Sequence, residues 1–139
     1  MQNENNKIHF GVYGIYIKDN NILVIKKGRG PYTGKYDLPG GRVEFGEKVE
    51  DTLKREFKEE VGGEIKSADF FMYNQNFLEN FHHFGLYFII NECKIEKIND
   101  QADGHDSLGA EFVDVDSLNE SNCAGIALET IRKYKKSLI

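Results

Sequence analysis

Residues 41–63, which read GRVEFGEKVEDTLKREFKEEVGG, carry the pattern that decides the fold. Between residues 47–61, apolar side chains recur at every fourth position, at Val49, Leu53 and Phe57, as expected of a helix that buries one face. The two glycines at the end stop the helix, because glycine readily adopts the left-handed conformation that follows a helix. The segment therefore predicts a helix that packs against other structure through one apolar side.

Strand patterns flank this helix on both sides. Residues 8–17 and 22–25 are apolar on both faces and are joined by a polar turn at residues 19–21. Apolarity on both faces indicates a sheet that is covered by other layers on both sides. Further strands are expected at residues 70–73, 85–90 and 111–115. This mixture of strands and helices predicts an α/β fold, an α/β/α sandwich around a mixed β-sheet.

The C-terminal segment predicts a second amphipathic helix. Asp116 or Ser117 is expected to cap it, since both side chains can accept a hydrogen bond from a free backbone N–H. Its apolar face is formed by Ala127, Ile131, Tyr134 and Leu138.

Length, charge and cysteine content limit the function classes. The 139 residues are expected to form a single domain, 1–139. A net charge of −5 disfavours partners such as nucleic acid or an anionic membrane surface. The chain has two cysteines, a polar start and no run near the roughly 20 apolar residues of a membrane helix. These features predict a protein of a reducing compartment, in the cytoplasm.

Three acids of the predicted helix lie on or beside its apolar stripe. Each residue advances about 100° around a helix, which places Glu56 and Glu60 near the direction of Val49 and Glu59 beside them. Partly buried carboxylates repel one another unless a proton or a hard divalent cation such as Mg²⁺ or Mn²⁺ compensates. The alternative is a solvated acidic face that Arg55 and Lys58 neutralise in part.

The same segment resembles the signature of the Nudix hydrolases. That signature is Gly-x5-Glu-x7-Arg-Glu-(apolar)-x-Glu-Glu-x-Gly-(apolar), and its charged and glycine positions are matched from Gly41 through Glu47 and Arg55 to Gly62. The preceding residues 38–41, Leu-Pro-Gly-Gly, are similar to the family as well. The last apolar position holds Gly63 instead, a departure that bears on packing at the helix exit more than on catalysis.

The resemblance implies roles for the residues of this signature. Glu56, Glu59 and Glu60 would bind Mg²⁺, for which Mn²⁺ is the expected substitute, together with the backbone carbonyl of Gly40. In an alternative assignment that the family also allows, Glu59 or Glu60 orients or deprotonates the attacking water.

The other fixed positions of the signature would support this site. Glu47 and Arg55 would form an internal pair that fixes the loop onto the helix, although a guanidinium can also stabilise phosphate charge. Gly41 would allow a tight turn and a close approach to the ligand.

Residues outside the signature complete the expected site. The family often supplies a base or an extra metal ligand from a loop before the last core strand, for which Asp106 is the first candidate and Glu111 the second. Five basic residues in or near segment 26–35 are available to bind phosphate, unless they only form a solvated loop. They are Lys26, Lys27, Arg29, Lys35 and Arg42, of which Arg29, Lys35 and Arg42 are taken as the candidates.

The resemblance implies Mg²⁺-dependent hydrolysis of a pyrophosphate bond in a nucleoside diphosphate linked to another group. The chain has no proline after Pro39 and therefore lacks the proline marks of the ADP-ribose and NADH subfamilies. A nucleoside triphosphate, normal or modified, is thus the expected substrate, and an ADP-ribose or nucleotide-sugar pyrophosphatase is the alternative. Aromatic residues that could stack on a base or belong to the core are Tyr73, Phe77, Phe81 and Phe84.

Two other classes of function compete with the hydrolase. One is a catalytically silent nucleotide sensor, which would have no chemical need for the full acidic cluster. The other is a structural domain with solvated acids, which predicts no stabilisation by Mg²⁺. A symmetric homodimer is expected of small domains of this kind.

Overall fold

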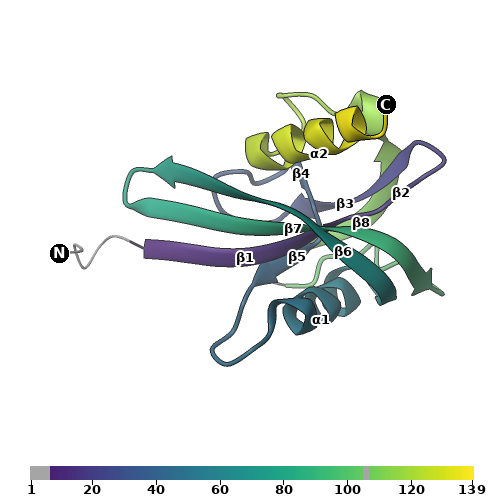
Figure 1. Ribbon diagram of the computed structural model, residues 1–139, viewed down its shortest axis with the longest axis horizontal. Helices are drawn as coiled ribbons and strands as arrows, with labels where there is room; N and C mark the ends of the chain where they lie inside the picture. The colour runs from purple at the N-terminus through teal and green to yellow at the C-terminus, as the bar shows by residue number, and fades with distance from the viewer. Residues whose placement is uncertain (1–6, 105–106) are drawn as a thin grey trace.

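The computed structural model describes residues 7–104 and 107–139 and has two helices on opposite sides of a β-layer (Figure 1). Helix α1 (Val49–Val61) covers one side and helix α2 (Gly125–Ser137) covers the other. The predicted α/β/α sandwich with a mixed sheet is therefore confirmed.

The mixed sheet has four strands in the order β5-β1-β7-β6. Strand β1 runs parallel to β7, whereas the pairs β1–β5 and β6–β7 are antiparallel. The bounds of the strands are Lys7–Ile15 for β1, Gly40–Arg42 for β5, Gly63–Leu78 for β6 and Phe81–Ile95 for β7.

A second sheet, which the sequence did not separate from the first, is antiparallel throughout. Its strands are β2 (Ile17–Lys18), β3 (Asn21–Lys27), β4 (Tyr36–Asp37) and β8 (Ser107–Asp114), and β3 pairs with each of the other three. The expected strand at residues 8–17 is interrupted at Tyr16, where the chain passes from the first sheet to the second. An apolar pattern shows burial but not which sheet a strand joins.

Strands β6 and β7 form a hairpin that is much longer than the segments expected at residues 70–73 and 85–90. The turn contains Asn80, whose φ of 60° lies in the left-handed region that asparagine tolerates. Polar residues such as Asn74 and His82 continue the strands beyond their apolar centres, so hydrophobic periodicity alone underestimated the length.

The buried side chains form two clusters, one under each helix. In β3, Ile22 and Val24 belong to the cluster under α2, whereas Leu23 and Ile25 belong to the cluster under α1. Successive side chains of a strand point to opposite faces, which explains why these strands are apolar on both. Each helix therefore packs on its own side of the sheets that carry the site.

The start of α2 differs from the expectation. Asp114 accepts a hydrogen bond from the Asp116 backbone N–H at 2.8 Å and caps a short 3₁₀ turn at Val115–Ser117, so neither Asp116 nor Ser117 caps the helix. Helix α2 begins only at Gly125 and has no side-chain cap, and Leu138, expected on its apolar face, follows its end and is exposed. In the described part of the chain, no helix has both the length and the apolar character to cross a membrane.

Candidate functional site

Strand β5 approaches both β1 and α1 closely at two glycine positions. Gly40 has a φ of 151°, and a Cβ added there would lie 2.1 Å from the carbonyl oxygen of Val12. A Cβ on Gly41 would lie 2.5 Å from the Cδ atom of Glu56. Residues 40 and 41 therefore bring their backbone against the acidic face of α1.

Glu60, in the last turn of α1, is buried and has an exposed fraction of only 3%. Its Oε1 accepts a hydrogen bond from the Gly40 backbone N–H at 2.8 Å. Burial raises the pKa of Glu60 well above its ordinary value, and the nearby Glu56 raises it further, while the Gly40 N–H opposes both. A cation or a proton that neutralises a buried carboxyl group of this kind therefore stabilises it.

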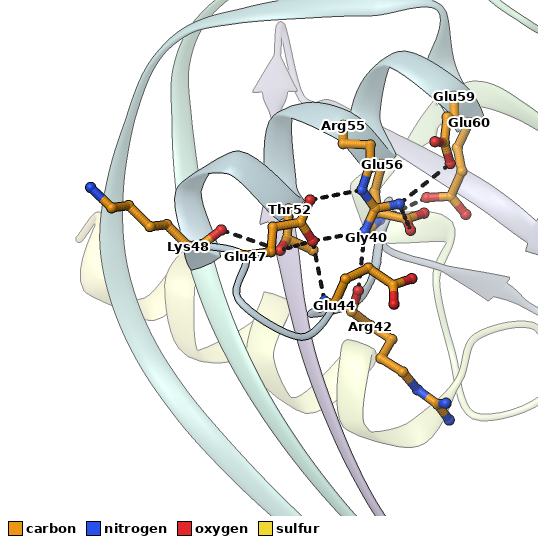
Figure 2. A network of polar contacts seen from close by, with 10 residues as sticks. All are labelled: Gly40, Arg42, Glu44, Glu47, Lys48, Thr52, Arg55, Glu56, Glu59 and Glu60. Carbon is orange, nitrogen blue, oxygen red and sulfur yellow. Dashed lines mark hydrogen bonds and ion pairs between the residues drawn. The ribbon is translucent and has the colours of Figure 1, made fainter.

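Arg55 connects the loop before α1 to the acids on the helix (Figure 2). Its Nε and Nη2 atoms donate to the two carboxylate oxygens of Glu47 at 2.9 and 3.0 Å, and Nη1 donates to Glu56 at 2.8 Å. These hydrogen bonds from Arg55, with a further one from Thr52, lower the pKa of Glu47 to about 2. The pair fixes the loop onto the helix, as a bidentate Arg–carboxylate contact has a defined geometry.

The third acid, Glu59, is only loosely held. Its side chain is 57% exposed, and its Oε2 lies 3.7 Å from Nη1 of Arg55. With the side chains in this arrangement, no three His, Cys, Asp or Glu residues of the described chain converge on a point where they could hold a metal ion. The structure therefore brings Glu56 and Glu60 to the edge of β5 but leaves Glu59 turned outward.

The carboxylates lie at one end of a cleft made of two adjoining pockets. The first pocket, about 300 Å³ in volume, contains Glu56, Glu60 and the glycines of β5. The second, about 270 Å³, lies between the first sheet and the start of α2 and is lined mainly by rings and small apolar side chains. The residues that line both pockets are His9, Tyr13, Lys27, Arg29 and Asp37.

The basic residues expected at phosphate lie in different places. Arg29 lines both pockets and Arg42 lines the pocket of the carboxylates, although its side chain points away from them in Figure 2. Lys35 instead donates to the backbone carbonyl of Glu120 at 3.3 Å and lines neither pocket. Lys27, at the end of β3, is the lysine that reaches both pockets.

The candidates outside the signature lie on or before β8. Asp106 falls outside the described residues. Glu111 is exposed on β8, accepts a hydrogen bond from the Tyr36 hydroxyl at 3.2 Å and lines neither pocket of the cleft.

Sequence reasoning missed the ring-lined pocket, where a repeated motif was available as a signal. His9 and Tyr13 on β1 pair in register with His83 and Tyr87 on β7, so His-x3-Tyr occurs on both parallel strands. The two imidazoles stack with their centres 5.2 Å apart, and the Tyr13 hydroxyl lies 2.9 Å from Nε2 of His83.

These rings form one wall of the pocket, in which the imidazole of His83 is neutral at physiological pH. Burial, followed by the nearby His9 and Lys27, lowers the pKa of His83 to about 4. Of the four aromatics considered for stacking, Phe81 lines this pocket, whereas Phe84 and Tyr73 stack on each other and line neither pocket of the cleft.

The signature, the two-sided sheet and the cleft agree with the comparison to known families. A family model described as the NUDIX domain matches residues 6–134. The chain belongs to the NUDIX family. The acids at positions 56, 59 and 60 lie within the matched range.

Curated relatives of this NUDIX chain match it over part of its length. The ADP-ribose pyrophosphatase of Methanocaldococcus jannaschii is 55% identical over 51 residues, which are 37% of this chain and 30% of that protein. The 8-oxo-dGTP diphosphatase of Buchnera aphidicola is 41% identical over 61 residues, 43% of this chain and 47% of that protein. The chain thus spans less than half of the length of each of these relatives.

Solved structures match the NUDIX fold over most of the chain. The MutT NUDIX hydrolase from Burkholderia pseudomallei superposes with a TM-score of 0.79 at 21% identity, covering 91% of this chain and 98% of that one. The NUDIX domain of Shewanella oneidensis NrtR, solved in complex with ADP ribose, has a TM-score of 0.75 at 16% identity and covers 96% and 90%. At these identities the likeness concerns the fold.

Proposed function

We propose that this NUDIX domain, residues 1–139, hydrolyses the pyrophosphate bond of a nucleoside diphosphate linked to another group, with a nucleoside triphosphate as the expected substrate. The observation that carries the proposal is the continuity of the cleft. A pocket lined by rings and a pocket lined by carboxylates share five residues, among them Lys27 and Arg29. A nucleoside in the ring-lined pocket would extend its phosphates past these two cations toward Glu56 and Glu60.

A divalent cation fits the chemistry of the carboxylate pocket. The donors are oxygen atoms only, which suit Mg²⁺ or Mn²⁺, and the buried Glu60 carboxyl needs a neutralising charge. Glu56, Glu59 and Glu60 would hold the cation once Glu56 and Glu59 turn away from Arg55, with the Gly40 carbonyl as a further ligand. When bound, the cation would neutralise the phosphate oxygens that otherwise repel a nucleophile.

The other residues of the site have separate roles in the proposed reaction. Arg55 with Glu47 holds α1 and the loop before it in fixed relation, so that the acids and the phosphates would meet in one geometry. Glu59, exposed and loosely held, is the acid free to orient or deprotonate water. Arg29 and Arg42 would contact the outer phosphates. Asp106 remains the candidate base from outside the signature.

The test is a screen for product release with Mg²⁺ across nucleoside triphosphates, ADP-ribose, NADH, diadenosine polyphosphates and nucleotide sugars. Pyrophosphate and orthophosphate are detected separately, and a phosphatase reports monophosphate products. The inactivating variant is Glu59→Gln, which removes a carboxylate from an exposed side chain and leaves the core unchanged. The matched control is Glu50→Gln, an exposed acid in the first turn of the same helix.

We expect turnover that depends on the metal, falls at least about 100-fold in Glu59→Gln and is retained in Glu50→Gln. Turnover of ADP-ribose but not of triphosphates would replace the expected substrate with the one named for the M. jannaschii relative. A ligand that raises the melting temperature without any turnover would make the chain a nucleotide sensor. If the chain showed no turnover, and if neither metal nor ligand raised its melting temperature, the proposed function would be refuted.

A further inference from the structure

An apolar band lies exposed on the α1 side of the first sheet, at the end of the sheet that α1 does not reach. In Figure 1, the β6–β7 turn and the start of β1 project well beyond α1. Five large apolar residues there have exposed fractions between 41% and 69%. They are Ile8, Phe10, Phe70, Tyr73 and Phe77, and we call this set the distal apolar band.

Ring contacts and strand register make the band one continuous surface. Phe10 on β1 stacks on Phe84 of β7 at 5.3 Å, and Phe84 stacks on Tyr73 of β6 at 5.5 Å, so three strands contribute to one row. In the next row, His82 of β7 pairs with Ile8, and its ring lies 4.5 Å from that of Phe77.

The band extends along the edge strand toward α1. Phe70 contacts the ring of Phe88 at 5.7 Å, and Phe88 is buried in the cluster under α1. The exposed surface is therefore a continuation of the core that no element among residues 7–104 and 107–139 covers.

The area of this surface lies in the upper part of the range for the largest apolar patch of a soluble monomer. If each of the five residues, four of them aromatic, is assigned about 200 Å², within the roughly 150–250 Å² that an aromatic side chain buries, the exposed fractions correspond to roughly 550 Å². The largest apolar patch of a typical soluble monomer is about 300–600 Å². Two such bands packed together would bury roughly 1,100 Å², above the approximately 1,000 Å² expected of a specific interface.

The charges around the band favour a partner with the same surface. Strand segments 8–15, 70–78 and 81–90 contain no Asp, Glu, Lys or Arg. Under a two-fold axis the band meets the same band of the other copy, residue i contacting residue j and j contacting i, so an uncharged band produces no like-charge repulsion. An anionic membrane surface would instead require clustered lysine or arginine, which these segments lack.

From this band we infer that two copies of the chain form a symmetric dimer by packing their distal apolar bands face to face. The interface is separate from the cleft, because none of Ile8, Phe10, Phe70, Tyr73 and Phe77 lines either of its pockets. The proposed interface nevertheless includes the end of β6. On the opposite face of this strand, Asn76 and Leu78 line the ring pocket.

The test measures the mass of the full chain in solution by sedimentation equilibrium and by light scattering after gel filtration. The variants are Phe77→Lys and Tyr73→Lys, which place a charge in the middle of the band on side chains that are 69% and 57% exposed. The matched control is Leu138→Lys, a 60% exposed apolar residue that follows α2, the helix on the side of the β-layer opposite to α1 (Figure 1). Thermal melts by circular dichroism establish that each variant is folded.

We expect the wild-type chain and Leu138→Lys to have twice the 15.9 kDa mass of one chain, whereas each band variant sediments as a folded monomer. The dissociation constant of the dimer should rise at least about 100-fold in Phe77→Lys, which corresponds to about 2.7 kcal/mol. A wild-type monomer at about 100 µM, a concentration at which even weak specific dimers form, would overturn the inference. A dimer that survives in both band variants, or that Leu138→Lys disrupts equally, would also overturn it.

Discussion

At the scale of single residues, the carboxylate pocket depends on the absence of a side chain at Gly41. A methyl group there would lie 2.5–2.8 Å from the carboxylate atoms of Glu56. We expect Gly41→Ala to displace that carboxylate and to lower kcat/KM about 10-fold, equivalent to about 1.4 kcal/mol of transition-state stabilisation. Steady-state kinetics at saturating Mg²⁺ measures the effect.

Gly125→Ala is the control for this variant, because a Cβ at Gly125 meets no atom within 4 Å. It should retain the kinetics of the wild type. If Gly41→Ala turned over substrate at the wild-type rate, Glu56 would have room to move without consequence, and its position beside β5 would not matter for the reaction.

Residue types and helical spacing predicted part of this site. The 100° step of a helix placed Glu60 beside the apolar stripe, and Glu60 is buried. The same reasoning did not find His83, because an isolated histidine in a strand is uninformative until the register with β1 is known. Spacing within one element can be read from sequence, whereas neighbours that come from different elements cannot.

At the scale of elements, the junction between α1 and β6 explains the glycine that departs from the family signature. Gly62 makes the turn, with a φ of 83° and its N–H bonded to the carbonyl of Lys58 at 3.1 Å. A Cβ on Gly63 would lie 2.6 Å from the Phe57 ring and 2.9 Å from Cγ1 of Ile95. The phenylalanine ring therefore occupies the space that the usual apolar residue would fill.

We accordingly expect Gly63→Val, which restores an apolar residue at this position, to destabilise the protein. Overpacking a filled core costs about 1–3 kcal/mol, and urea denaturation should show that loss in the free energy of unfolding. Combining Gly63→Val with Phe57→Leu frees space at the ring, so the double variant should lose less than the sum of the two single losses. A stabilising Gly63→Val, or additive losses, would contradict this account of the junction.

The elements themselves were predictable to different degrees. Helix α1 shows a regular four-residue apolar period, and its predicted end at Val61 agrees with the structure. The start of α2 was wrong because Asp114 and the 3₁₀ turn use the capping residues before the helix begins. Local signals identify a turn, but only packing decides whether a helix continues from it.

At the scale of the whole molecule, the cleft is assembled from segments that are far apart in the chain. The ring pocket combines His9 of β1, Asp37 of β4, Phe81 of β7 and Ala127 of α2. Its existence therefore depends on the parallel pairing of β1 with β7 and on α2 crossing that side of the sheet, and no segment of sequence contains either fact. Under the proposed function, the same assembly would separate substrate binding at the rings from chemistry at the acids.

This separation predicts that variants in the ring pocket change mainly KM, whereas variants in the carboxylate pocket change mainly kcat. The Phe81 ring lies 5.9 Å from that of His9 and 6.4 Å from that of His83, in the wall of the ring pocket. Stacking of a base on an aromatic side chain contributes about 1–3 kcal/mol, so Phe81→Ala should raise KM about 10-fold or more and change kcat only slightly.

Glu59→Gln should instead lower kcat and leave KM nearly unchanged, because Glu59 is expected to act on the attacking water rather than on the base. Phe112→Ala, at an exposed ring of β8 outside both pockets, is the control for the loss of an aromatic side chain and should leave both constants unchanged. If Phe81→Ala lowered kcat while KM stayed constant, the ring pocket would not bind the nucleoside. The phosphates would then have to enter the carboxylate pocket from another direction, for example past Arg42 and Glu44, which also line it.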